Sequence, residues 1–203
     1  MSRPEGALAP RDRPATERAI VEAAAGLLAA KGFAALNVQA VAEAAGVDRK
    51  LVYRYFGGVE GVVERLGSEI RWTLGKADGP SSGDNYGAAI SHLARAYADA
   101  LAGDATLRGL IAWELVESTP LLRALEAARS ATLQAWMARR IDGLPRPEGV
   151  DAPAINAVLI AGIQMLALRR GQGRPFAGVT LDDAGWARIE AAVEALGRRI
   201  YAD

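Results

Sequence analysis

Apolar residues recur along most of the chain at the three- and four-residue steps of one helix face, and almost no segment alternates as a strand does. Ala, Leu, Arg and Glu, which are all good helix formers, dominate the sequence. The pattern therefore predicts an all-α fold. The predicted helices cover residues 16–31, 38–45, 49–56, 59–75, 85–102, 106–117, 120–141, 152–170 and 182–201.

Short polar residues and glycines mark the ends of the first helices. Thr16, Asn37 and Asp48 are the predicted N-caps, because their side-chain oxygens can accept a hydrogen bond from a free N–H of the first turn. Gly32 and Gly46 are the predicted ends, since each allows a left-handed residue after a helix.

The stretch VQAVAEAAGVDRKLVYRYFGG, residues 38–58, predicts two short helices joined by a tight turn. Their close crossing needs a small side chain, which Ala42 provides, and the turn needs Gly46. Val52 points an apolar side chain back at the first helix. This spacing indicates a helix-turn-helix, although an alanine-rich helical hairpin can also meet it by chance.

The outward face of the second short helix carries Arg49, Lys50 and Tyr53, which share one surface at about 100° per residue. Arginine and lysine can read guanine O6 and N7 in the major groove, and tyrosine hydroxyls suit phosphate oxygens. A solvated charged face is the alternative interpretation, but with the turn pattern we favour contact with double-stranded DNA. The predicted DNA-binding residues are Asn37, Gln39, Asp48, Arg49, Lys50, Tyr53, Arg54 and Tyr55.

These motifs resemble the DNA-binding domain of the tetracycline-repressor (TetR) family of bacterial transcription factors, over residues 16–71. The resemblance is carried by a first helix ending AAKGFAALNV, by VAEAAGVDRKLVYRYF, and by the longer helix that follows. It implies that the helix with Arg49, Lys50 and Tyr53 lies in the major groove. It also implies that Asn37 and Gln39 contact DNA from the preceding helix.

The sequence departs from the family pattern in two places. Tyr55 stands where members commonly have His, and the resemblance implies that Tyr53 and Tyr55 hold phosphates. Gly58 and Val59 stand where members commonly have Ser-Lys or a similar pair, so a phosphate contact from lysine is missing. The free N–H groups and positive dipole at the start of that helix can still bind phosphate.

We divide the chain into a disordered arm at 1–14, a helix-turn-helix DNA-binding domain at 15–58, a connecting helix at 59–75 and a ligand-binding and dimerisation bundle at 76–203. The linker KADGPSSGDN, residues 76–85, marks the boundary because Gly, Ser, Asp and Pro are concentrated there. Arg3, Arg11 and Arg13 are candidate minor-groove contacts, but we favour a merely disordered tail.

The last two helices carry the apolar pattern of an interface. In 182–201 apolar residues recur at steps of three and four between charged positions, which predicts a helix–helix seam. The segment 152–170 is apolar around most of its circumference. It is shorter than the roughly 20 apolar residues of a membrane span and contains Asn156 and Gln164, so we favour a buried or interface helix. A core within one chain is the alternative to a homodimer. The resemblance implies the homodimer, with predicted interface residues Ile155, Leu159, Gly162, Trp186, Ile189, Val193, Leu196 and Ile200.

The middle helices mix large apolar residues with a few polar ones, as ligand pockets do. Such residues are more often ordinary core, but the resemblance implies a small-molecule site there. Glu114 and Glu117 favour a cationic or hydroxylated compound unless they simply face water. The predicted effector-binding residues are Trp113, Glu114, Glu117, Trp136, Met137, Gln164 and Met165.

Composition narrows the function. Lys+Arg and Asp+Glu both number 24, so any attraction to DNA must come from a local patch. There is no cysteine, and His92 is the only histidine, so metal, cofactor and histidine-based catalytic sites are not expected. Neither a catalytic motif nor a signal peptide is recognisable, so we expect a cytoplasmic bacterial protein that is not an enzyme. We predict a ligand-responsive regulator, a repressor that binds a palindromic operator as a homodimer and is released by a small apolar or amphipathic effector. The alternative is a helical protein-interaction module without DNA binding.

Overall fold

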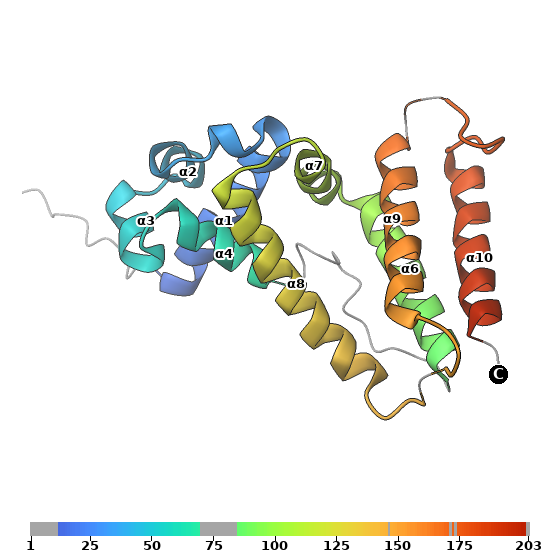
Figure 1. Ribbon diagram of the computed structural model, residues 1–203. Coiled ribbons are helices and arrows are strands. Elements are labelled where there is room, and N and C mark those ends of the chain that lie inside the picture. Colours follow the sequence, from blue (N-terminus) through green and yellow to red (C-terminus); the bar gives the residue numbers. More distant parts are fainter. Residues whose placement is uncertain (1–11, 70–84, 146, 171, 173, 202–203) are drawn as a thin grey trace, which may run out of the picture.

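The computed structural model describes residues 12–69, 85–145, 147–170, 172 and 174–201. In this part of the chain helices account for almost all regular structure, so the predicted all-α fold is confirmed (Figure 1). The elements are α1 Arg13–Lys31, the 3-10 helix η1 Phe33–Ala35, α2 Val38–Ala45, α3 Arg49–Phe56, α4 Val59–Ser68, α6 Tyr86–Gly103, α7 Ala105–Glu114, α8 Pro120–Ile141, α9 Ala152–Arg169 and α10 Asp183–Ile200.

Local capping explains the boundaries of α2 and α3. The Asn37 side chain accepts a hydrogen bond from Ala40 N–H at 2.9 Å, and Asp48 accepts one from Lys50 N–H at 2.8 Å. Gly46 ends α2 in the left-handed conformation, with φ 66°. Both predicted N-caps and the predicted turn glycine are confirmed, and the two helices have the predicted bounds.

Two helix ends differ from the predictions. The first helix begins at Arg13 rather than after Thr16, because Pro14 fits the first turn and Asp12 is the N-cap; the Thr16 hydroxyl donates to Asp12 O at 3.1 Å. The helix predicted over 59–75 ends at Ser68, and Glu69 is extended. The sequence carries no stop signal at Glu69, which is why the pattern overran. The predicted linker and most of the predicted arm lie outside the described residues.

The helices of the second half have nearly the predicted bounds, except that α7 ends at Glu114 rather than at 117. Its last turn tightens there, since the N–H groups of Val116 and Glu117 both donate to Trp113 O. Leu115 and Val116 are left exposed.

The molecule has two main apolar cores, and both α7 and α8 contribute residues to each of them. The first core joins α1–α4 with Leu110 of α7 and with Leu122 and Leu125 of α8. The second joins α6, α9 and α10 with other residues of α7 and with Trp136 of α8. Figure 1 shows α7 and α8 between the α1–α4 group and the group of α6, α9 and α10. A displacement of α8 therefore reaches both cores.

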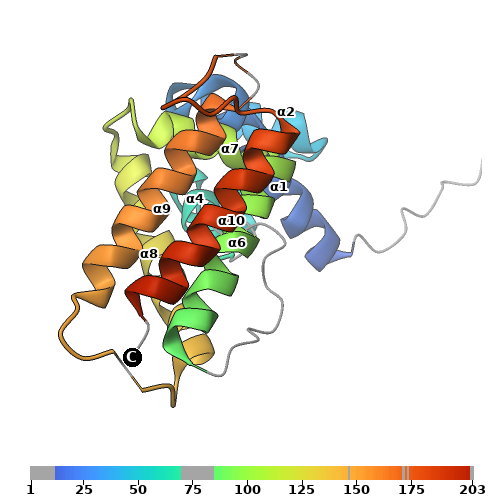
Figure 2. The same cartoon turned by 90° about the vertical axis from the view of Figure 1, so that its right-hand side faces the viewer.

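The helices α9 and α10 run side by side at the end of the molecule away from α3 (Figures 1 and 2). Both pack on α6, which lies behind them in the view of Figure 2. Their opposite sides therefore face outward.

Candidate DNA-binding surface, subunit interface and effector cavity

The outer surface of α3 is basic and exposed. Arg49, Lys50, Tyr53 and Arg54 are all exposed, and 58% of the Tyr53 surface is accessible. Val52, on the opposite side of the helix, is completely buried in the core of α1–α4. The helix is thus held by its apolar side, while its cations and a phenol project outward as one group.

The neighbouring predicted DNA contacts are partly engaged within the chain. Asn37 and Asp48 are exposed but each uses one side-chain oxygen as a helix cap. The Gln39 amide donates to Glu43 at 2.9 Å, close to the exposed surface. Tyr55 is half-buried, and the Arg13 guanidinium lies 5.2 Å above its ring. Arg13 therefore belongs to the helical domain beside Tyr55, which the prediction of an arm through residue 14 did not foresee.

An exposed apolar stripe runs along α9. The exposed residues of this stripe run from Ala154 to Met165 at alternating steps of three and one residues, so they share one outward face of the helix. Val158 has 72% and Met165 46% of its surface exposed, and Leu196 on neighbouring α10 has 48%. No atom lies within 4 Å of a Cβ built on Gly162 in the described part of the chain, so another backbone has room to approach. The outward face of α9 consists of Ala154, Ala157, Val158, Ala161, Gly162 and Met165.

The helix α9 is also long and apolar enough to cross a membrane by length and composition, the one such helix among the described residues, and 17% of that window is buried. Its inward side is polar at two places that contact α6. Asn156 Nδ2 donates to Tyr86 Oη at 3.3 Å, and Gln164 Nε2 donates to Tyr97 Oη at 2.9 Å. The two amides are satisfied within the helical bundle.

The seam predicted in the last helix lies inside the chain. Trp186, Ile189 and Val193 are buried in the second core, where α10 packs on α6. Their assignment to a subunit interface is therefore corrected, because a pattern of apolar positions shows that a stripe is covered but not by which helix. Gly162 and Leu196 do lie on the outer surface.

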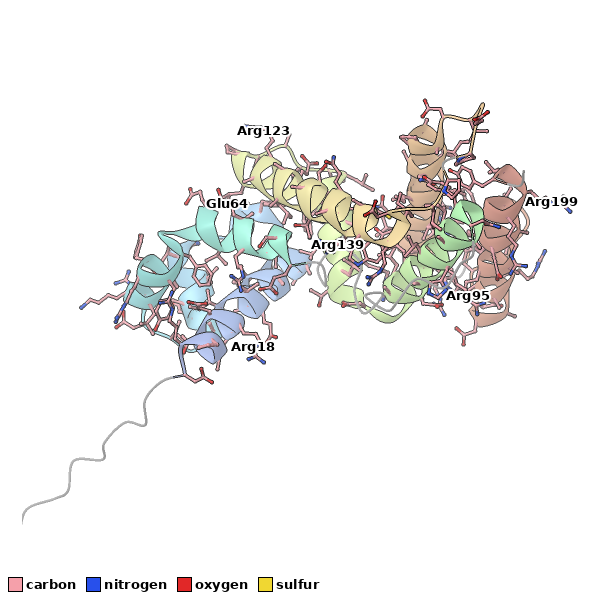
Figure 3. The ribbon with its side chains drawn as sticks, turned by 90° about the horizontal axis from the view of Figure 1, so that it is seen from below. Arg18, Glu64, Arg95, Arg123, Arg139 and Arg199 are labelled. Atoms are coloured by element: carbon pink, nitrogen blue, oxygen red, sulfur yellow. The ribbon has the colours of Figure 1, made fainter. Side chains whose placement is uncertain are left out.

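Three other predicted interface residues are half-buried. Ile155 and Ile200 pack against a small cluster centred on Tyr86 and Tyr201, and Leu159 lines a cavity. Charged side chains border the outer surface of this end of the molecule. Figure 3 shows Arg95 and Arg199 projecting there, and Arg95 forms an ion pair with Glu194 at 3.6 Å.

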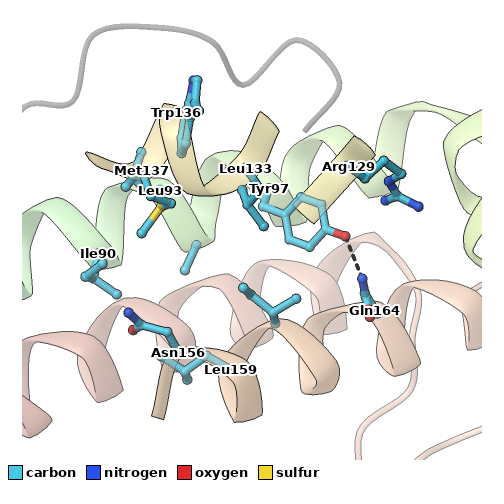
Figure 4. Close-up of a pocket in the computed structure, with 12 residues that line it drawn as sticks. Ile90, Leu93, Tyr97, Arg129, Leu133, Trp136, Met137, Asn156, Leu159 and Gln164 are labelled. Atoms are coloured by element: carbon cyan, nitrogen blue, oxygen red, sulfur yellow. Dashed lines mark hydrogen bonds between the residues drawn. The ribbon is translucent and has the colours of Figure 1, made fainter. Parts of the chain in front are cut away.

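A cavity of about 100 Å³ lies between α6, α8 and α9 (Figure 4). Most of its wall is apolar, with contributions from all three helices. The apolar side chains include Ile90, Leu93, Leu133, Trp136, Met137 and Leu159. Four polar residues, Tyr97, Arg129, Asn156 and Gln164, interrupt this wall. The combination of an apolar wall and a few polar anchors is typical of a small-molecule site.

Three of the polar residues, Tyr97, Arg129 and Gln164, lie together at one end of the cavity in Figure 4, and Asn156 lies toward the other end. Arg129 is 9% exposed, and its guanidinium pairs with the Glu114 carboxylate at the end of α7. Its Nε is buried and has no hydrogen-bond partner among the described residues. Burial raises the pKa of Tyr97, so its phenol is neutral, and burial lowers the pKa of Arg129.

The seven predicted effector-binding residues do not come together. Trp136, Met137 and Gln164 line the cavity, whereas Met165 lies on the outward face of α9. Trp113 and Glu117 instead hold α7 and the turn that follows it to the end of α1 and to η1. Trp113 Nε1 donates to Ala29 O at 3.2 Å, and Glu117 accepts from Phe33 N–H at 3.2 Å.

Glu114 is not free to attract a cation, because Arg129 already balances its charge. Arg129 and Tyr97 could not be predicted as cavity residues, because an isolated arginine in a helix usually faces solvent and tyrosine is buried only in some positions. The available signal was the spacing on α8, where Arg129, Leu133 and Trp136 share one face.

The wall helix α8 packs directly on α4, the helix that follows α3. Gly67 of α4 packs so closely on α8 that a Cβ there would lie 2.7 Å from Ala128 Cβ and 2.8 Å from Leu125 O. It would also lie 3.2 Å from Arg129 N, and Arg129 lines the cavity. The cavity wall and α4 therefore share one contact.

Residues 20–66 match the sequence profile of the family described as bacterial regulatory proteins, tetR family. None of the curated proteins matches the chain. Among solved structures, the fold is similar to that of a TetR family transcription regulator from Marinobacter aquaeolei VT8, with a TM-score of 0.62 and 19% identity over 90% of this chain and 95% of that one.

Two further structures are similar at comparable levels. Salmonella enterica GusR has a TM-score of 0.66 and 15% identity, over 96% of this chain and 98% of its own. FadR from Bacillus subtilis, solved in complex with stearoyl-CoA, has a TM-score of 0.60 and 18% identity, over 89% of this chain and 96% of its own. The chain is thus similar to the bacterial regulatory proteins of the tetR family in residues 20–66, which contain the helix-turn-helix, and it shares the fold of these regulators over nearly its whole length.

Proposed function

We propose that the chain is a homodimeric transcriptional repressor that binds a palindromic operator through α3 and leaves it when a small molecule enters the cavity. One observation carries the DNA-binding part of the proposal: Arg49, Lys50 and Tyr53 project together from a helix that Val52 anchors in the core. On a helix placed in the major groove, Arg49 and Lys50 would donate to guanine acceptors. Tyr53, Arg54 and Tyr55 would contact phosphates.

The proposed domains follow from this arrangement. We assign DNA binding to residues 15–58, extended to Arg13 because the first helix begins there, connection to residues 59–75 and ligand binding with dimerisation to residues 76–203. Such a regulator needs neither a cofactor nor a catalytic residue, and we propose neither. Its place of action is the bacterial cytoplasm, where the operator is.

A second copy of the chain is required by the electrostatics of DNA binding. One α3 offers few cations, whereas specific binding usually needs several phosphate contacts whose counterions are released. We propose that the outward face of α9, together with Leu196 of α10, packs against the same face of a partner. Small side chains along that face support close helix packing. The hydrogen bonds of Asn156 and Gln164 to α6 support a bundle helix over a membrane span.

The proposed release mechanism uses α8. At about 100 Å³ the cavity is smaller than the roughly 300–1,000 Å³ of most ligand sites, so a ligand has to widen it. Widening displaces α8, which contacts α4 at Gly67. Since α4 follows α3 directly, the separation of the two α3 helices in the dimer changes. A coupling free energy of about 1–3 kcal/mol is sufficient to lower operator affinity many-fold.

The experiment that tests DNA binding begins by selecting bound duplexes from a random pool. Fluorescence anisotropy then measures the affinity for a selected and a scrambled duplex over a range of salt concentrations. We expect affinity to fall with salt, and Arg49→Ala to lose about 1–3 kcal/mol of preference for the selected sequence. Lys31→Ala is the control, because Lys31 is exposed at the end of α1 that meets α7. Failure to select any duplex would refute the function and favour the protein-interaction alternative.

A further inference from the structure

We infer that the cavity between α6, α8 and α9 binds an amphipathic monocarboxylate, with its carboxylate on Arg129 and its apolar body along α8 and α9. The inference rests on the proposed effector role of the cavity and names the class of ligand. It replaces the cationic or hydroxylated ligand expected from Glu114 and Glu117, neither of which lines the cavity.

Arg129 supplies the anion-binding group. A guanidinium presents five N–H donors in one plane, and Glu114 occupies the Nη1 side of this one. Nε–H is buried and has no hydrogen-bond partner in the part of the chain that the structure describes. A buried donor without an acceptor is costly, and a carboxylate is the acceptor that fits a guanidinium edge best.

Tyr97 adds a second donor near the same end of the cavity (Figure 4). Its oxygen accepts the hydrogen bond from Gln164 Nε2 at 2.9 Å, which leaves the phenol proton for another acceptor. Because burial raises the pKa of Tyr97, this proton stays on the phenol at neutral pH. Arg129 and Tyr97 together favour an anionic oxygen over a cation.

The rest of the wall limits the ligand to one charged group. Leu93, Leu133, Met137 and Leu159 favour a hydrocarbon body. Asn156 is the remaining polar residue of the wall, and its amide is already hydrogen-bonded to Tyr86 and Tyr201. The apolar part of the ligand is therefore held by burial and the head by hydrogen bonds, which is the division found in most small-molecule sites.

The ligand carboxylate competes with Glu114 for one guanidinium. Glu114 ends α7, and nearby Trp113 and Glu117 bind Ala29 near the end of α1 and Phe33 at the start of η1. A second carboxylate on Arg129 weakens the ion pair between α7 and α8. The ligand thus acts on the contact of α7 with the DNA-binding helices, in addition to widening the cavity.

Octanoate and its neutral analogue octanamide test the inference, with binding measured by calorimetry and by tryptophan fluorescence. We expect octanoate to bind about tenfold or more tightly than octanamide. Arg129→Met should abolish this preference, whereas Arg123→Met should keep it, because Arg123 is exposed at the start of the same helix (Figure 3). Glu114→Gln keeps a hydrogen-bonding group of the same size, so it tests the site even if Arg129→Met fails to fold. It should tighten octanoate binding several-fold and leave octanamide binding unchanged.

Equal binding of the acid and the amide by the native protein would overturn the inference, as would an unchanged octanoate affinity in Glu114→Gln. If neither compound binds while the protein still binds its selected duplex, the inference is also overturned. The proposed DNA-binding function is unaffected by that result. If octanoate binds as expected but does not release the duplex in a gel-shift assay, the ligand class is supported and the proposed release mechanism is wrong.

Discussion

The contact between Gly67 of α4 and helix α8 allows a direct test of how the cavity is connected to the DNA-binding helices. In Gly67→Ala the new methyl group meets Ala128 Cβ at 2.7 Å and Leu125 O at 2.8 Å, whereas ordinary contacts begin at 3.4 Å. Because the Leu125 oxygen belongs to the backbone, a side-chain rotation cannot relieve the clash. The two helices have to separate by about 0.7 Å.

Gly26→Ala provides the matched control for the helix propensity of alanine. Gly26 is an exposed glycine inside α1, and the described chain has no atom within 4 Å of its added Cβ. Both substitutions gain about 1 kcal/mol of helix propensity, but only Gly67→Ala incurs about 1–3 kcal/mol of overpacking. The two variants should therefore differ by about 1–3 kcal/mol in the free energy of unfolding. For a chain of this size the difference in Tm is about 2–12 °C, measurable by calorimetry.

Gly67→Ala should also mimic the ligand, since it moves α4 away from α8 without any ligand. We expect its affinity for the selected duplex to fall about tenfold, as measured by anisotropy, with Gly26→Ala unchanged. The dimer mass, measured by sedimentation, should remain that of the native protein. If Gly67→Ala has the same Tm and the same DNA affinity as Gly26→Ala, the contact between α4 and α8 does not transmit the displacement.

Three further predictions follow from particular residues. Val158→Arg should give a folded monomer in sedimentation experiments, because it places a charge on the outward face of α9. The control Leu115→Arg, at an exposed residue away from this face, should remain dimeric. If both variants remain dimeric, the proposed interface is wrong. Tyr55→Phe should weaken selected and scrambled duplexes alike in a gel-shift assay, and a sequence-dependent effect would contradict its assignment to phosphate. Burial, with the charges of Tyr86 and Asp151, raises the pKa of Tyr201 to about 12. Because the unfolded state loses this proton at lower pH than the folded state, the free energy of unfolding should fall between pH 10 and 12. Tyr201→Phe should reduce that fall, as measured by urea titrations.

The helix-turn-helix could be predicted from the sequence because its determinants are local. Asn37 and Asp48 cap α2 and α3 with their own side chains, and Gly46 provides the left-handed residue between them. Each feature is decided within a few residues, so the bounds of both helices could be predicted. By contrast α4 ends at Ser68 without any stop signal in the sequence.

The location of the cavity depended on packing between distant segments and could not be predicted. Trp113 and Trp136 have similar sequence contexts, but one reaches the backbone of α1 and the other the cavity. Arg129 resembles a solvent-exposed arginine until α7 brings Glu114 against it. The seam of α10 was recognised correctly as covered, and only the structure shows that α6 of the same chain covers it.

The most direct test of the account is the dependence of binding on the spacing between operator half-sites. In the proposed dimer the two α3 helices would enter successive major grooves about 34 Å apart, close to one turn of the duplex. Inserting about five base pairs at the centre of the selected palindrome turns one half-site to the opposite face of the DNA. We predict that the insertion abolishes tight binding and that two chains bind each native duplex. Equal affinity for both duplexes, or one chain per duplex, would contradict the account.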